Sequence, residues 1–297
     1  MTLSHANNVP QKPARVVVLG AGGFIGRRLV RALTDAGIES VALGSRDIDL
    51  ADGAAAARLA EQLRRNDSVV FLAALTPDKG RDSGTLMRNL AMCRAVCEAT
   101  QKVELAHLVC ASSDAVYSLD TALISEETPS VPVDLYGAMH RTRELMLAAE
   151  AKAPLAIFRI PALYGAGDTH NSYGPNRFLR QALKDGSIAL FGNGEEMRDH
   201  VCVDDAADLM LRVVLQRSTG LLNLATGTST SFHAVAELIA AGLDRPILIK
   251  PSARQNPVTH RHFDVTNALR AFPSMRFRPL KDGLTAMIAD TRAMAGG

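Results

Sequence analysis

Three glycines near the amino terminus have the spacing of a diphosphate-binding turn. Gly20, Gly23 and Gly26 follow an apolar run at residues 15–19 and open an amphipathic stretch. The first glycine of such a turn allows a tight bend, the second lets the backbone approach a pyrophosphate, and the third lets helix and strand pack closely. Amides at the helix start then bind the anion. The pattern predicts an NAD or NADP site with contacts from Gly20, Gly23, Phe24, Ile25 and Gly26; the alternative is a glycine-rich turn without a ligand.

The end of the second predicted strand bears on which of the two dinucleotides is bound. A carboxylate there would bind the ribose hydroxyls of NAD and repel the 2′-phosphate of NADP. The strand instead ends Leu43-Gly44-Ser45-Arg46, and a guanidinium beside a hydroxyl suits a phosphomonoester. We therefore expect NADP in preference to NAD. In the alternative, Arg46 is solvated and Asp47 or Asp49 reaches the ribose. The contacts expected at this edge are Ser45, Arg46, Asp49 and Leu50.

Alternating apolar runs and amphipathic segments must position these residues. Short, mostly apolar runs predict strands at residues 15–19, 40–43, 68–72, 105–111 and 155–160. Apolar residues at three- and four-residue intervals predict helices at residues 24–36, 51–64, 85–100 and 135–152. Strands that alternate with helices form a parallel sheet covered on both faces. The predicted fold class is α/β, a Rossmann-type doubly wound parallel sheet with a smaller carboxyl-terminal lobe.

The domain organisation follows from changes in composition along the chain. The opening stretch is polar and contains two prolines, whereas glycines break the chain into loops and short elements after residue 160. We expect a flexible tail at residues 1–13, a dinucleotide-binding domain at residues 14–165, and a substrate-binding lobe at residues 166–297. A segment at about residues 199–224 is expected to return to the first domain.

Bulk composition limits the partners. The 297 residues carry a net charge of +2 with the basic residues dispersed, so we expect no nucleic-acid partner. The apolar runs are too short to span a bilayer, and the opening stretch lacks the apolar core of a secretion signal, so we expect a cytoplasmic protein without a membrane partner. The cysteines lack paired metal spacing and are expected in the core, with no bound metal. They are Cys93, Cys97, Cys110 and Cys202.

Four further segments add to the glycine turn. They are Phe71-Leu72-Ala73-Ala74, Ala111-Ser112-Ser113-Asp114-Ala115-Val116-Tyr117, Leu135-Tyr136-Gly137-Ala138-Met139-His140, and Arg198-Asp199-His200-Val201-Cys202-Val203-Asp204-Asp205. Together they resemble the extended short-chain dehydrogenase/reductase family, the nucleotide-sugar epimerases, dehydratases and 4-ketoreductases, over nearly the whole chain. The resemblance implies further cofactor contacts from Leu72, Ala73, Ala74, Asn89 and Pro161.

The same resemblance implies the catalytic residues. Tyr136 matches the phenol that gives or takes a proton while hydride moves between substrate and nicotinamide, and Ser113 matches the hydroxyl that binds the substrate oxygen. For Ser113 the alternative is a strand-end serine that satisfies the backbone. A tyrosine has a pKa near 10 and needs nearby positive charge to act as a base. In the family a lysine one helical turn later supplies this charge and orients the nicotinamide ribose, but this chain has His140 there.

Three interpretations of His140 stay open. In the first it does the work of the lysine less strongly, and turnover declines as pH rises through its titration. In the second, Arg141 or Arg143 helps. In the third, catalysis is lost. Because a ketone reduction uses the tyrosine as an acid, which needs less activation than proton abstraction, reduction is favoured over oxidation.

The same resemblance implies the residues that contact the substrate. Ala115 stands where the 4,6-dehydratases of the family carry a glutamate, so elimination of water is disfavoured. Family substrates carry a nucleoside diphosphate, which bidentate arginine contacts suit. Arg198 has the alternative of a structural salt bridge to Asp204 or Asp205. The expected substrate contacts are Asp114, Asn176, Arg198 and Arg254.

The sequence thus predicts an NAD(P)-dependent oxidoreductase or epimerase that acts on a small-molecule substrate, a nucleotide sugar, by 4-keto reduction or epimerisation. The resemblance leaves open a homodimer through the helix that carries Tyr136. The alternative function is a non-catalytic NAD(P)-binding redox sensor or regulatory protein that kept the glycine turn after losing the lysine.

Overall fold

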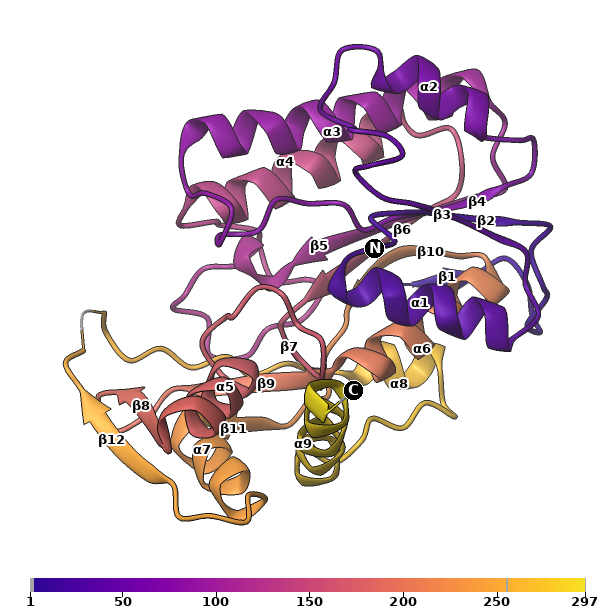
Figure 1. Ribbon diagram of the computed structural model, residues 1–297. Coiled ribbons are helices and arrows are strands. Elements are labelled where there is room, and N and C mark those ends of the chain that lie inside the picture. Colours follow the sequence, from indigo (N-terminus) through magenta and orange to yellow (C-terminus); the bar gives the residue numbers. More distant parts are fainter. Residues whose placement is uncertain (1–2, 255, 297) are drawn as a thin grey trace.

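A seven-stranded sheet with the strand order β1-β10-β6-β5-β4-β2-β3 forms the centre of the larger domain (Figure 1). The computed structural model describes residues 3–254 and 256–296. Six strands run parallel: β2 (Val16–Leu19), β3 (Ser40–Leu43), β4 (Ser68–Phe71), β5 (His107–Ser113), β6 (Leu155–Ile160) and β10 (Ser218–Asn223). β2 and β4 are buried along their whole length, as expected for apolar strands between two layers of helices.

Helices cover both faces of this sheet (Figure 1). On one face lie α1 (Phe24–Asp35) and α6 (Val203–Gln216), which contact each other and share a core with the sheet. On the other face lie α2 (Ala55–Gln62), α3 (Ser83–Lys102) and α4 (Leu135–Glu150). The predicted fold class, a doubly wound parallel α/β sheet with a smaller lobe, is confirmed.

Local sequence explains where two of these helices begin. The Asp82 carboxylate accepts a hydrogen bond from Thr85 N (2.7 Å), which starts α3 two residues before the predicted boundary. The Asp134 carboxylate accepts from Gly137 N (2.8 Å) and starts α4 at Leu135. A short 3-10 turn, η1 (Asp114–Val116), follows β5 and meets the start of α4.

The smaller lobe packs around its own apolar core, which includes Tyr164, Phe178, Phe232 and Ile239. Its strands are β7 (Ala162–Tyr164), β8 (Ser187–Phe191), β9 (Met197–Cys202), β11 (Ser229–Ser231) and β12 (Leu248–Ser252). They form a three-stranded sheet, β11-β9-β7, and a two-stranded sheet, β12-β8. Its helices are α5 (Pro175–Asp185), α7 (Phe232–Ala241) and α9 (Leu280–Gly296), whereas α8 (Thr266–Ala271) contacts β10 of the large sheet.

The opening stretch differs from the flexible tail predicted for residues 1–13. Residues Ser4–His5 form β1, which pairs antiparallel with β10. His5 shares hydrogen bonds with Ser218 Oγ (2.7 Å) and Ala271 O (2.9 Å), and its ring lies against Phe272. Without this pairing β10 would expose an unpaired edge, and two strand residues are enough to cover part of it. Residues 1–2 of the expected tail lie outside the described residues.

The four cysteines are buried without disulfides. Cys93 and Cys97 of α3 share a core with Cys110 of β5, and Cys202 lies in the core of the smaller lobe. Within the described ranges, no helix has the length and apolarity needed to cross a membrane. The same part of the chain gathers no set of three or more His, Cys, Asp or Glu side chains that could hold a metal ion.

Two buried histidines in the strands are uncharged at neutral pH. His107 in β5 donates from Nε2 to Ser218 O (2.6 Å), and burial lowers its pKa to about 4. Burial lowers the pKa of His200 in β9 to about 3. Because both histidines regain an ordinary pKa near 6.5 on unfolding, the unfolded chain binds more protons than the folded chain below that pH.

We therefore predict that the free energy of unfolding decreases as the pH is lowered below about 6.5, by about 1 to 2 kcal/mol per histidine at about pH 5. In His107→Gln, which keeps a donor for Ser218 O, the decrease should be smaller. Chemical denaturation at a series of pH values measures it. The exposed His233→Gln is the matched control and should keep the pH dependence of the unmodified chain. An equal dependence in all three proteins would contradict the prediction.

Candidate active site

A cavity of about 1120 Å³ lies along the carboxyl edge of the large sheet and reaches the smaller lobe. Its volume suits a dinucleotide together with a small substrate. Most of the residues that the sequence predicted at the site line it: Gly20, Gly23, Phe24, Ile25, Gly26, Ser45, Arg46, Asp49, Leu50, Leu72, Ala73, Ala74, Ser113, Tyr136, His140, Pro161 and Asn176. Four others do not: Asn89, Asp114, Arg198 and Arg254.

The glycine turn fits a diphosphate. Gly20 has φ +89°, and a Cβ atom there would lie 2.7 Å from Ala73 N at the end of β4. A Cβ atom on Gly26 would overlap Gly20 O, so only glycine lets α1 pack this closely on the turn. Gly23 caps α1 without a side-chain hydrogen bond, which leaves the amides of the first turn available to an anion in the cavity.

The edge of the cavity at β3 is where the sequence predicts the contacts with the adenosine ribose of the cofactor. Asp47 accepts from Gly44 N (2.7 Å) and Asp49 accepts from Ala51 N (3.0 Å), so both carboxylates hold their own turn. Arg46 is exposed and forms neither an ion pair nor a hydrogen bond within residues 3–254 and 256–296. The free cation of this edge is therefore Arg46.

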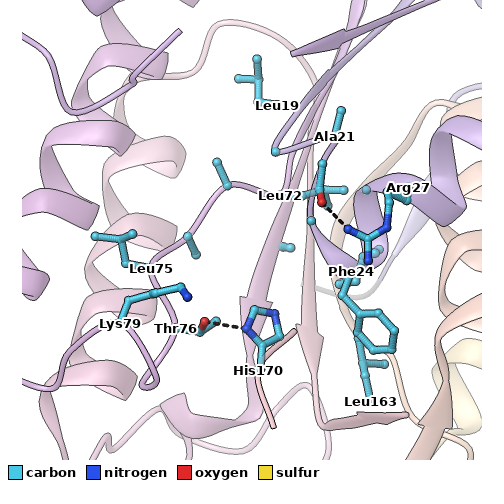
Figure 2. A pocket seen from close by; sticks show the side chains of 18 of the residues that line it. Leu19, Ala21, Phe24, Arg27, Leu72, Leu75, Thr76, Lys79, Leu163 and His170 are labelled. Carbon is cyan, nitrogen blue, oxygen red and sulfur yellow. Dashed lines mark hydrogen bonds between the residues drawn. The ribbon is translucent and has the colours of Figure 1, made fainter. Parts of the chain in front are cut away.

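Side chains that the sequence did not single out lie at the mouth of the cavity (Figure 2). Thr76 Oγ1 and the Nδ1 atom of His170 are 2.9 Å apart and connect the loop after β4 with the smaller lobe. Lys79 extends from the same loop over the cavity, and Arg27 donates to Gly22 O (2.5 Å) and Gly167 O (2.7 Å). These residues lie in or contact loops without periodicity, so no local sequence signal identifies them.

Tyr136, His140 and Ser113 meet at one wall of the cavity. Tyr136 lies in the first turn of α4, and His140 follows one turn later, with ring centroids 4.7 Å apart and an edge-to-face angle of 86°. Ser113 ends β5, and its Oγ accepts from Ala115 N (3.2 Å), so the serine does satisfy the backbone while it also faces the cavity. Gly137 permits this arrangement because a Cβ atom there would overlap Ala115 O.

Burial controls the charge of these groups. Desolvation raises the pKa of Tyr136 to about 12, and Asp114 and Asp134 act in the same direction, whereas the Ser113 hydroxyl and the charge of Arg143 oppose it. Burial, with a further contribution from Arg143, lowers the pKa of His140 well below its ordinary value. His140 is therefore an uncharged imidazole near neutral pH. The interpretation in which His140 replaces the charge of a lysine is not supported.

The predicted substrate residues divide into two groups. Asn176 lines the cavity, and its amide group bonds Gly165 N (3.1 Å) and Leu163 O (3.2 Å). Arg254 lies elsewhere, paired with Glu195 and Glu196 and bonded to Phe191 O (2.9 Å). Its own ion pairs thus hold it on the outer part of the smaller lobe, away from the cavity lining.

Arg198 and Asp114 lie together behind the cavity wall with a residue that the sequence did not predict. Arg198 donates to Thr259 O (2.6 Å) and does not form the salt bridge considered for it, because Asp204 and Asp205 pair with Arg278. The missed residue is Arg261, which is buried, donates to Asp114 O (3.1 Å) and lies 3.6 Å from the Asp114 carboxylate. Burial nevertheless raises the pKa of Asp114, although both arginines oppose the shift.

Asn89 does not line the cavity but holds a loop that does. Its Oδ1 accepts from Leu75 N (2.8 Å) and its Nδ2 donates to Leu75 O (3.1 Å) and Thr85 O (3.1 Å). These bonds fix the loop that follows β4, which itself lines the cavity. Asn89 therefore positions the loop that lines the cavity.

Comparisons with known proteins agree with this architecture. The model of the NAD dependent epimerase/dehydratase family matches residues 16–225. MoeE5, solved in complex with UDP-glucose and NAD, is 26% identical, with 95% of this chain and 99% of MoeE5 covered and a TM-score of 0.82. The UDP-glucose 4-epimerase of Thermus thermophilus, solved with NAD, is 20% identical over 94% of this chain and 99% of its own, with a TM-score of 0.82. A GDP-L-fucose synthetase from Naegleria fowleri bound to NADP is 16% identical over 100% and 98%, with a TM-score of 0.82.

Gly26→Ala should disrupt the diphosphate-binding turn, because the added methyl group overlaps the backbone of Gly20 and Ala21. We expect a loss of unfolding free energy of about 1 to 3 kcal/mol and at least about tenfold weaker binding of NADPH, measured by calorimetry. Gly53→Ala is the matched control, since its Cβ atom meets nothing within 4 Å. Unchanged NADPH affinity in Gly26→Ala would contradict the role of the turn.

Proposed function

The chain belongs to the NAD-dependent epimerase/dehydratase family, and we propose that it is an NAD(P)-dependent oxidoreductase or epimerase that acts on a nucleotide sugar. One observation carries the proposal: a continuous cavity joins the glycine turn to Tyr136 and Ser113 and extends to the smaller lobe. The similarity to MoeE5, whose structure contains UDP-glucose and NAD, supports the substrate class.

Each group of the cavity has a task in this proposal. The amides of the α1 first turn would hold the cofactor diphosphate. A bound nicotinamide would supply hydride chemistry at a carbon of the sugar. Tyr136 gives a proton to the sugar oxygen in reduction and takes it back in oxidation, and Ser113 orients that oxygen. Because the pKa of Tyr136 is raised to about 12, the phenol is protonated near neutral pH, which favours proton donation and hence 4-keto reduction.

Elimination of water has less support than reduction or epimerisation. Ala115, in the η1 turn beside Ser113, has no group that can take a proton. Asp114 is the neighbouring carboxyl group, but Arg261 holds its backbone and carboxylate. The proposal therefore keeps Tyr136 as the proton-transferring residue of the cavity.

A second candidate function follows from the neutral His140. Without a cation one turn after Tyr136, the chain could bind a nicotinamide dinucleotide as a redox sensor or regulatory protein without turning over a sugar. The uncharged imidazole is the observation that favours this candidate. The two functions differ in turnover and not in cofactor binding.

The expected cofactor preference is NADP, carried by Arg46. Arg46→Ala should weaken binding of NADPH by about 10- to 100-fold, because a charge-assisted hydrogen bond contributes about 1.5 to 3 kcal/mol. Binding of NADH should change little. Arg58→Ala, an exposed arginine of α2 paired with Asp52, is the control and should alter neither affinity. Equal loss of both dinucleotides in Arg46→Ala, or no loss of either, would contradict NADP selection by this residue.

The function is tested by turnover of the purified protein with a panel of 4-keto and 4-hydroxy nucleotide sugars and either dinucleotide. We expect turnover that falls by at least about 100-fold in Tyr136→Phe, while calorimetry finds cofactor binding retained. Tyr164→Phe is the matched control, since its hydroxyl is buried in the smaller lobe without a hydrogen-bond partner in the described part of the chain. Cofactor binding without turnover in the unmodified protein would support the sensor instead.

A further inference from the structure

Arg143 lies in α4, seven residues after Tyr136. It differs from the other buried arginines in its lack of an acidic partner among the described residues. Arg15 pairs with Asp67 (2.6 Å), Arg159 pairs with Glu144 (2.7 Å), and Arg261 lies 3.6 Å from Asp114. Arg143 is 1% exposed, and no carboxylate in the described ranges lies within 4.0 Å of its guanidinium. Its positive charge is therefore buried without a neutralising anion.

The contacts of Arg143 hold the charge in place but do not cancel it. Nη2 donates to Ala73 O (3.0 Å), Nη1 lies 3.8 Å from Met139 Sδ, and the guanidinium lies 4.3 Å from the centre of the Phe71 ring. Nε has no partner among the described residues. Burying a cation in this way is unfavourable unless something compensates. Because a buried charge is only weakly screened, the guanidinium acts on its polar neighbours.

Helix geometry places Arg143 on the face of α4 that also carries two residues of the cavity lining. Residues 136, 140 and 143 are spaced by four and three positions, so Tyr136, His140 and Arg143 share one face of α4. The arginine also reaches Ala73, which lines the cavity beside the glycine turn. Arg141 points away from this face, because it pairs with Glu144 (3.0 Å) and is 38% exposed. Of the two arginines considered from the sequence, only Arg143 lies behind the cavity wall.

His140 lies between Tyr136 and Arg143 in the order of this helix face, and its properties suit a hydrogen-bonding group and not a cation. It is 4% exposed, lines the cavity, and has no hydrogen-bond partner on either ring nitrogen within the described residues. An uncharged imidazole can donate from one nitrogen and accept at the other. Two unused nitrogens at the wall of a dinucleotide-sized cavity suit a ribose hydroxyl.

We infer that the two tasks that the family assigns to one lysine are divided in this chain between Arg143, which supplies the positive charge felt by Tyr136, and His140, which hydrogen-bonds the cofactor ribose. Arg143 is a positioning residue, since it acts through Tyr136 and lines no part of the cavity. The inference rests on the proposed proton transfer by Tyr136, and it deepens that proposal.

Several other groups act on Tyr136 and Arg143. Ser113 and Asp114 face the phenol from β5 and η1, and Asp134 precedes it at the start of α4. Cys93 Sγ of α3 lies 3.8 Å from the carbonyl oxygen of Arg143. The charge of Arg143 lowers the pKa of Cys110 in β5, against the larger effect of burial. The Ser113 hydroxyl and the charge of Arg143 favour ionisation of the phenol, whereas Asp114 and Asp134 oppose it.

The first test measures the ionisation of Tyr136 without any substrate. The chain has four tyrosines and no tryptophan, so the ultraviolet difference spectrum between a protein and its Tyr136→Phe counterpart isolates this tyrosinate. In Arg143→Met the onset of ionisation should move to higher pH by about one unit, whereas Arg143→Lys should move it less. Arg141→Met, an exposed arginine of the same helix, should leave the onset in place. Circular dichroism defines the pH range in which each variant is folded, and an unmoved onset in folded Arg143→Met would overturn the inference.

The second test separates charge from structural support. Arg143→Met should slow sugar oxidation by about tenfold, the kinetic equivalent of one pKa unit, and shift the rising limb of the pH profile upward, with little change in KM. The double variant His140→Lys/Arg143→Met should recover most of that rate, because a lysine at position 140 restores a cation but cannot replace the contact with Ala73. Failure of this rescue, with Arg143→Lys as slow as Arg143→Met, would show a purely structural arginine. If the unmodified protein turns over no nucleotide sugar, the proposed function fails, while the titration still decides the role of Arg143.

Discussion

The backbone contact between Gly20 and Ala73 is the constraint on which the rest of the site depends. Gly20 can approach Ala73 N only because it has no Cβ atom. Ala73 O in turn accepts the hydrogen bond of Arg143, which belongs to the helix that carries Tyr136. One glycine, one strand end and one arginine thus set the distance between the glycine turn and the phenol of Tyr136.

Burial decides the protonation state of the titratable side chains at the site. Desolvation keeps Tyr136 protonated and His140 neutral near neutral pH, and it raises the pKa of Asp114 against the effect of two arginines. A protonated phenol beside a neutral imidazole favours proton donation to a ketone over proton abstraction from an alcohol. The buried charge of Arg143 opposes this bias, because it favours ionisation of the phenol.

The two lobes contribute different kinds of residue. The larger domain supplies backbone amides, the phenol and the imidazole from the ends of parallel strands and the helices that follow them, the edge at which α/β proteins bind ligands. The smaller lobe supplies Asn176 to the lining and Arg198 and Arg261 behind it. Arg261 contacts Asp114 of the larger domain, so residues of both lobes meet behind this part of the cavity wall.

Short-range patterns in the sequence were sufficient to predict the parts of this protein that local geometry controls. The spacing of Gly20, Gly23 and Gly26 predicts the turn. The spacing of four positions from Tyr136 to His140 places both side chains on one helical face, as the structure has them. The alternation of strands and helices predicts the sheet, because each unit is short enough for periodicity to identify it.

Only the tertiary structure decided which distant segments meet. Arg261 reaches Asp114 across 147 residues, whereas Arg254, seven positions earlier, is held by Glu195 and Glu196, and nothing in the local sequence distinguishes the two arginines. The docking of residues 4–5 on β10 and the contact of Thr76 with His170 have the same origin. The charge of His140 was equally undetermined, because a pKa depends on burial, and burial depends on packing among segments that are far apart in the chain.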